Sequence, residues 1–241
     1  MAAYSTKDAR LIVGAYDVSA YVDSVNVKMN AVVDPFHPLG ATFPTTYDTG
    51  LRNGELTVSG LYDGVISQFL IAGAETNITS LEVEGGTAGT RAYCFPAPQV
   101  SAHEVGLSAD QMHRLTPEYA ISGKVHNAFV VAPLALRTTA SNLDSADTDG
   151  LAPSTGATAF LHVTALDLDG YDNVVITPRD SDDAITWADC SSSFAAVSAG
   201  ANLYQALTLT GTVDQYLSVS WAYTGSGTSP TVGFSVYIAR D

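Results

Sequence analysis

The chain has 241 residues, of which 46% are hydrophobic and only 15% are charged, a balance that argues against a disordered protein. Its 25 acidic and 10 basic side chains give a formal net charge of −15, so it has few groups with which to neutralise phosphates and tight wrapping of nucleic acid is not expected. The low charged fraction also indicates that neighbouring subunits cover part of the surface.

Residues 1–138 predict a first, β-rich domain. Apolar and polar residues alternate over residues 24–29 and again over residues 55–59, which is typical of strands with one buried face. Further short strands are expected at residues 10–13, 92–95, 100–105, 118–125 and 129–133.

Two other segments of this first domain have a different pattern. Residues 33–54 contain three prolines and have no regular period, so we expect a long functional loop between the two alternating strands. Residues 64–72 predict one short helix, because Asp63 is a suitable N-cap and Gly73 a suitable C-terminal stop.

The segment 139–158 is rich in Ser, Thr, Ala, Asp and Gly and carries no basic residue, so it is interpreted as a linker. Residues 159–241 then predict a second β domain, a sandwich of short strands separated by turns. Its clearest strand is residues 217–223, where Leu, Val, Trp and Tyr share one face. Because the linker separates two cores, removing residues 140–241 is expected to leave self-assembly through the first domain largely intact.

No catalytic or metal-binding motif is found in the sequence, so neither an enzyme activity nor a cofactor or metal is expected. The acidic clusters do not fit an EF-hand loop, which also requires a distal Glu, and they are interpreted as turn-forming residues. They consist of Asp144, Asp147 and Asp149, and of Asp167, Asp169 and Asp172.

Several other residue types have ordinary structural interpretations. Glu82 and Glu84 are expected side by side on a solvated hairpin edge. The two cysteines, Cys94 and Cys190, are too few for a disulfide framework and are interpreted as small core residues. The N-terminus lacks a secretory signal and no stretch is long enough to span a bilayer, so we expect a protein made in the cytoplasm without a membrane partner.

The chain resembles the major tail tube proteins of tailed bacteriophages over most of its length. The resemblance begins with the segment DVSAY at residues 17–21 and a Thr42-Phe43 pair that ends a loop. It continues with the pattern Y-x-x-G-L-x-x-x-x-L-x-x-S-G-x-x-D-G at residues 47–64 and with VVAPL at residues 130–134. FLHVTA at residues 160–165 and Thr186-Trp187 resemble a C-terminal β domain found in some members.

The resemblance implies an all-β fold with one short helix: a tail-tube-type β-barrel or sandwich, followed by an Ig-like or jelly-roll-like sandwich on the outer surface. It implies hexameric rings that stack into a tube in the virion tail and conduct DNA without binding it specifically. The implied partners are other copies of the chain and the tape measure, terminator and distal tail proteins.

The resemblance also assigns roles to two groups of residues. The long loop would make contacts between stacked rings, and polar positions of the long strands would form an acidic lumen wall that repels phosphates. The stacking candidates are Pro35, Phe36, Pro38, Phe43 and Tyr47, and the lumen candidates are Asp23, Glu55, Thr57 and Ser59.

Two other functions remain open at this stage. A capsid decoration protein would also be β-rich and non-enzymatic, but it would bind heads rather than polymerise. A carbohydrate-binding or adsorption module would act through residues 159–241, where Trp187, Trp221 and Tyr223 lie.

Overall fold

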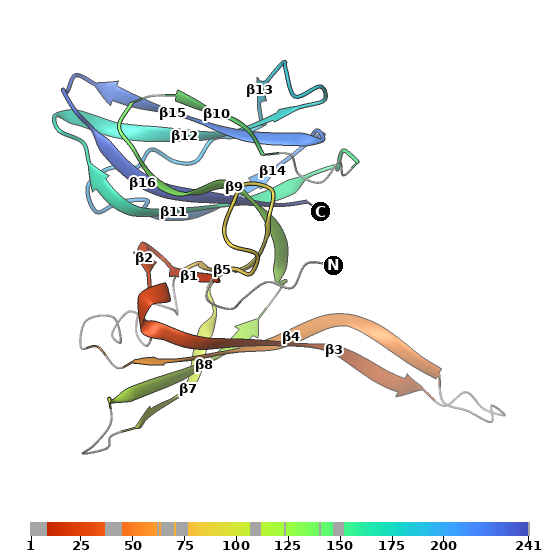
Figure 1. Ribbon diagram of the computed structural model, residues 1–241. Coiled ribbons are helices and arrows are strands. Elements are labelled where there is room, and N and C mark those ends of the chain that lie inside the picture. Colours follow the sequence, from red (N-terminus) through yellow and green to blue (C-terminus); the bar gives the residue numbers. More distant parts are fainter. Residues whose placement is uncertain are drawn as a thin grey trace. The chain divides into compact units, whose positions relative to one another are not determined.

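The structure, a computed structural model, describes the chain from residue 9 to residue 240 with several gaps (Figure 1). The described ranges are 9–36, 45–61, 63, 70, 77–106, 112–122, 124–139, 141–146 and 152–240. For residues 30–36, 45–53, 122 and 141–146 only the backbone is described.

The described strands form three antiparallel sheets, which confirms the all-β prediction. A 3₁₀ turn, η2, covers Ser19–Tyr21. The helix expected over residues 64–72 lies outside the described residues, except for the buried Leu70.

The chain forms two compact units, and each combines segments distant in sequence. The first, here the sandwich unit, consists of Met1–Ala20, Asn77–Pro96 and His126–Asp241. The second, the insert unit, consists of Tyr21–Thr76 and Ala97–Val125.

This division differs from the one expected at residues 139–158. Part of the expected linker is strand β10, and strands from both sides of it pair within one sheet. Strand periodicity identifies which residues face a core, but it carries no information about which distant strand becomes the neighbour.

The largest sheet of the sandwich unit has eight strands and is called the eight-stranded sheet. Its central strand β16 is buried along nearly its whole length, because alternate side chains enter two different cores. In sheet order the strands are β14 (Tyr204–Leu209), β11 (Ala157–Asp167), β16 (Thr231–Arg240), β9 (His126–Arg137), β6 (Arg91–Phe95), β5 (Thr79–Glu82), β1 (Arg10–Val13) and β2 (Tyr16–Asp17).

A four-stranded sheet, the covering sheet, packs on one face of the eight-stranded sheet (Figure 1). The core between them contains Leu217, Val219 and Trp221 on one inner face, as the alternation in this segment predicted. The strands of the covering sheet are β10 (Ser141–Ala146), β15 (Tyr216–Gly225), β12 (Tyr171–Ser181) and β13 (Ala188–Asp189).

The opposite face of the eight-stranded sheet encloses a second core. Ile12 on β1, Phe160 on β11 and Tyr237 on β16 belong to one buried cluster, although β1 and β11 are far apart in the strand order. The sheet must therefore curl until distant strands face each other, as in a partly closed barrel.

Arg137, at the end of β9, is a buried cation that stabilises a bulge. The pairing of β9 with β16 shifts register between Ala132 and Ala135, which leaves backbone carbonyls without regular partners. The guanidinium donates to the carbonyls of Pro133, Ala135 and Phe234 at 2.8–2.9 Å.

Two aromatic rings complete the environment of the Arg137 guanidinium. Its central carbon lies 3.8 Å from the ring centroid of Phe234 and 5.3 Å from that of Trp221. Burial lowers the pKa of Arg137 to about 10, so it remains protonated at neutral pH.

The insert unit contains a second four-stranded sheet, the insert sheet. Its strands alternate in direction along the order β3-β4-β8-β7. They are β3 (Val22–Phe36), β4 (Thr45–Leu61), β8 (Arg114–Ser122) and β7 (Gln99–Gly106).

Replacing Arg137 with Lys should destabilise the sandwich unit by about 2–4 kcal/mol, because an ammonium group cannot satisfy three carbonyls in one plane while stacking on a ring. Chemical denaturation of wild type and Arg137→Lys would measure this. The exposed Arg91→Lys on β6 is the matched control and should be near neutral. Equal stability of the two variants would contradict the role of Arg137.

Truncation after residue 139 should leave no folded sandwich unit, because β9 then loses β16 and the curled sheet loses β11 and β14. Circular dichroism and proteolysis of residues 1–139 would test this. A cooperative melt with protected β1, β5 and β6 would instead support the division expected from sequence.

Candidate functional site

The insert sheet has two long open edges. Within the described part of the chain, β3 pairs only with β4, and β7 pairs only with β8. The edge strands are 15 and 8 residues long, whereas the strands that end the two sheets of the sandwich unit have two residues (β2 and β13) or six (β14 and β10). Natural sheets usually shorten or cover their edges, so the insert sheet differs from the rest of the molecule in this respect.

The β3–β4 hairpin extends beyond the sheet as a two-stranded ribbon (Figure 1). Strand β8 ends opposite Asn53, but β3 and β4 remain paired as far as Phe36 and Thr45. The ribbon occupies most of the segment expected as a long loop, because backbone pairing can continue where side-chain alternation is absent. An isolated two-stranded ribbon is marginally stable in water, so this one is suited to packing against another surface.

The ribbon contains some of the residues expected in ring stacking. Pro35 and Phe36 lie on β3, and Tyr47 lies on β4 opposite Asp34. Pro38 and Phe43 lie outside the described residues.

One face of the insert sheet is apolar and the other is polar. The apolar face carries Leu56 and Val58 of β4 and Leu115, Tyr119 and Ile121 of β8, all of them buried. The intervening residues of β4 are three of the lumen candidates, Glu55, Thr57 and Ser59, and they lie together on the polar face.

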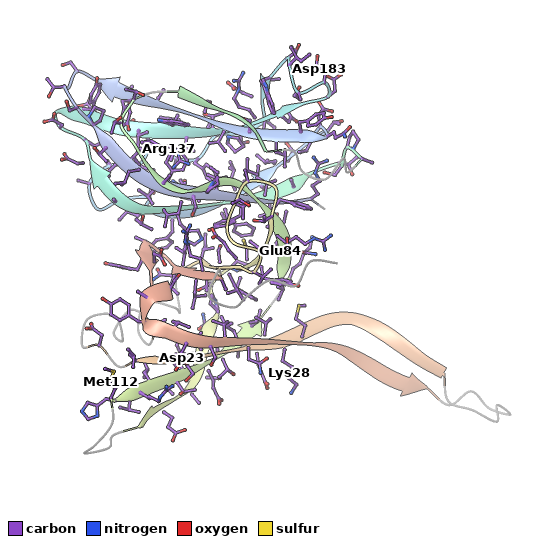
Figure 2. The ribbon with its side chains drawn as sticks, viewed as in Figure 1. Asp23, Lys28, Glu84, Met112, Arg137 and Asp183 are labelled. Carbon is purple, nitrogen blue, oxygen red and sulfur yellow. The ribbon has the colours of Figure 1, made fainter. Side chains whose placement is uncertain are left out.

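Two ion pairs cross the polar face. The Lys28 ammonium lies 3.5 Å from the Glu55 carboxylate, directly across the β3–β4 pair. The Arg114 guanidinium of β8 donates to the carboxylate of Asp23, the fourth lumen candidate. Asp23 and Lys28 are labelled on β3 in Figure 2.

Both edge strands also expose apolar side chains. Met29 on β3 is 56% exposed and Val105 on β7 is 39% exposed. Met29 lies on the same face of β3 as Val25 and Val27, and Val105 pairs with the buried Leu115. Both side chains therefore lie at the margins of the apolar face. Such positions gain most from a further strand added at the edge.

Inside the curled sheet, a serine and a histidine form a pair that resembles a nucleophile and its base. His162 Nε2 lies 2.8 Å from Ser80 Oγ, and Nδ1 lies 2.7 Å from the carbonyl oxygen of Gly14. Because a carbonyl only accepts, Nδ1 carries the proton, and the Ser80 hydroxyl donates to Nε2. Ser80 Oγ is also 3.2 Å from Cys94 Sγ.

The pair is structural because nothing can reach it. Ser80, His162 and Cys94 are all fully buried, so no substrate can approach the hydroxyl. Burial lowers the pKa of His162 to about 4, and burial raises the pKa of the Cys94 thiol to about 12. The pair therefore joins β5 and β11 as neutral hydrogen-bonded groups.

Glu82 contradicts the expectation of a solvated hairpin edge. Its side chain is fully buried, accepts a 2.6 Å hydrogen bond from the Tyr237 hydroxyl and lies 3.6 Å from the Arg10 guanidinium. Burial raises its pKa despite these partners. Sequence alternation missed this because β5 is buried on both faces within the curl; Glu84, in contrast, is partly exposed and accepts from the Arg91 amide.

The remaining candidate residues form no further site. The described residues contain no group of three or more His, Cys, Asp or Glu placed to hold a metal ion. Asp169 accepts from Thr228 and Ser229 across two turns, which is the turn-forming role expected of it. Asp147 and Asp149 lie outside the described residues, and for Asp144 only the backbone is described.

The aromatic residues considered for sugar binding do not form an open platform. Trp221 is buried and donates to the carbonyl of Thr139 at 2.6 Å, while Tyr223 packs against the same core. Trp187 is half-buried beside Arg179, which donates to its carbonyl. Among the helices that the structure describes, none is both long and apolar enough to cross a membrane.

Comparison with known proteins gives distant structural similarities only. No protein-family model and no curated protein matches the sequence. A chain in the virion of a native gene transfer agent particle is 12% identical, with a TM-score of 0.41, over 52% of this chain and 98% of that one. A chain from the tail of an empty gene transfer agent particle is 11% identical, with a TM-score of 0.41, over 52% of this chain and 98% of that one.

The Dit protein of phage SPP1, described as a hub of the adsorption apparatus, is 11% identical with a TM-score of 0.36, over 97% of this chain and 99% of that one. The chain thus has a distant structural similarity to components of phage and gene transfer agent tails.

The buried histidine predicts a specific pH dependence. In the unfolded chain His162 takes up a proton near its usual pKa of about 6.5, but in the folded protein only near 4, so stability is lost as the pH falls through this window. The loss attributable to His162 should approach about 3 kcal/mol. Glu82 opposes it, since its raised pKa favours the folded state at low pH.

The contribution of His162 can be isolated by difference. His162→Gln can still donate to Gly14 and accept from Ser80, so its stability should depend less on pH between 7 and 4 than that of the wild type. Denaturation at several pH values would measure this, with the exposed His113→Gln as the control. Parallel curves for wild type and His162→Gln would contradict the assignment.

Proposed function

We propose that the chain is a structural subunit of a phage tail and, more specifically, a major tail tube protein whose copies form hexameric rings that stack around a DNA-conducting lumen. The observation that carries this proposal is the insert sheet with two long open edges, each bearing an exposed apolar side chain. The sequence resemblance to tail tube proteins covers the same strands.

The strand directions support ring closure. The insert sheet has an even number of strands that alternate in direction, so β3 and β7 run in opposite directions. Rotation about a ring axis that runs along the strands preserves strand direction. The β7 edge of one copy and the β3 edge of the next therefore meet antiparallel, and every junction repeats the pairing found inside each copy.

The size of the closed barrel is compatible with a conduit. Six copies of the insert sheet would give roughly 24 strands, and with strands about 4.8 Å apart and tilted by about 40° the backbone diameter would be roughly 50 Å. This leaves an open channel after side chains are added. The polar face would line it, which assigns Asp23, Glu55, Thr57 and Ser59 to the lumen.

The ribbon gives the rings a means of stacking. It projects past the end of β8, so in a barrel it would extend beyond the rim of one ring and reach the next. In this arrangement Pro35, Phe36 and Tyr47 contact an adjacent ring, which removes the ribbon from water. Other partners would be the tape measure, terminator and distal tail proteins.

Charges added at the open edges should block assembly. Met29→Lys together with Val105→Lys places an ammonium at each edge, and both positions are exposed enough for the subunit to stay folded. Negative-stain microscopy at high protein concentration should show hollow tubes for the wild type and none for the double variant. Leu136→Lys with Ile185→Lys is the matched control in the sandwich unit and should form normal tubes.

The outcomes separate the related functions. A wild type that stays monomeric at every concentration would overturn the proposal, as would normal tubes from the edge variant. Single rings that never stack would indicate a hub position in the tail rather than a tube.

A further inference from the structure

Two ion pairs lie on the polar face of the insert sheet. Both are solvent-exposed: the Lys28 and Glu55 side chains are each 63% exposed, and Arg114 and Asp23 are 54% and 43% exposed. Exposed pairs of this kind contribute little to folding. Their arrangement therefore calls for another explanation.

Lys28 and Arg114 are the basic residues among the described side chains of this face. Each has a carboxylate in contact with it. Glu55 of the neighbouring strand β4 contacts Lys28 of β3, and Asp23 of β3 reaches across β4 to Arg114 of β8. Glu118 of β8 and Glu104 of β7, which pairs with Thr116 of β8, are exposed on the same face and add two negative charges. The described side chains of this face therefore carry four acids and two bases, a net charge of −2.

We propose that Asp23 and Glu55 mask Arg114 and Lys28 from duplex DNA, so that DNA slides over this face without being held. The proposal deepens the proposed function and rests on it for its biological meaning. Phosphate binding arises when a basic side chain replaces a condensed counterion, and a basic side chain already neutralised by a carboxylate cannot do so effectively. In a tube the same two cations recur in every copy, so unmasked they would form a continuous track of phosphate contacts.

Removing the two negative charges while preserving shape tests the proposal. Asp23→Asn and Glu55→Gln keep an oxygen that can accept from Arg114 and Lys28, so the sheet should remain intact. The probe is a short fluorescent DNA duplex, with binding followed by anisotropy at low salt. The double variant should bind at least about tenfold more tightly than wild type, with the gain lost as salt is raised.

Two controls separate masking from a general change in charge. Asp172→Asn with Asp182→Asn removes two exposed acids from the sandwich unit and changes the net charge equally, so it should not gain DNA binding. Adding Lys28→Gln and Arg114→Gln to the double variant should abolish the gain. The proposal is overturned if the double variant binds no better than this control, or if the fourfold variant keeps the gain.

The assembly state is scored separately by negative-stain microscopy of the same samples. A gain in DNA binding without tubes would support the masking of Lys28 and Arg114 while contradicting the tail tube function. Tubes without any gain would leave the tube function standing and overturn the masking.

Discussion

Among the described strands, none pairs with the outer edge of β3 or of β7, and the proposed assembly depends on this constraint. Every amide and carbonyl on the outer side of β3 and β7 must be satisfied by water or by another strand, and 15 and 8 residues are long runs to leave open. Met29 and Val105 are exposed apolar side chains, so contact with water is unfavourable on the apolar side of each edge. An antiparallel strand from another copy would pair with the open backbone and cover these side chains at the same time. Strand addition would therefore satisfy the hydrogen-bonding groups and bury the apolar side chains in one step.

The sandwich unit has shorter edge strands than the insert sheet, none of them longer than six residues. Several of its buried polar groups have specific partners. Arg137 satisfies the carbonyls of a bulge, while Ser80 and His162 link strands that the sheet order separates widely. The Ser80–His162 hydrogen bond supports the curl of the eight-stranded sheet, because β5 and β11 would be far apart on a flat sheet.

Charge is distributed unevenly between residues 159–241 and the polar face of the insert sheet. Most of the net −15 lies away from the polar face of the insert sheet, and residues 159–241 alone contain nine acids and two bases. A strongly acidic exterior keeps large assemblies dispersed. On the polar face, both described bases are instead paired with an acid, and Glu104 and Glu118 are in excess. Overall composition therefore overstates how acidic a lumen built from this face would be.

The sequence by itself determined the β class, the inward faces of the best strands and the absence of recognisable catalytic motifs, because these depend on alternation and spacing within one segment. Leu217, Val219 and Trp221 were placed correctly for this reason. Only the tertiary structure decided that β10 replaces an expected linker, that residues 33–54 are mostly paired as a ribbon, and that Glu82 is buried. The ribbon is a local hairpin in which backbone pairing continues without side-chain alternation. The other two features depend on which distant strand lies alongside, and a strand's own residues do not encode the identity of its neighbour.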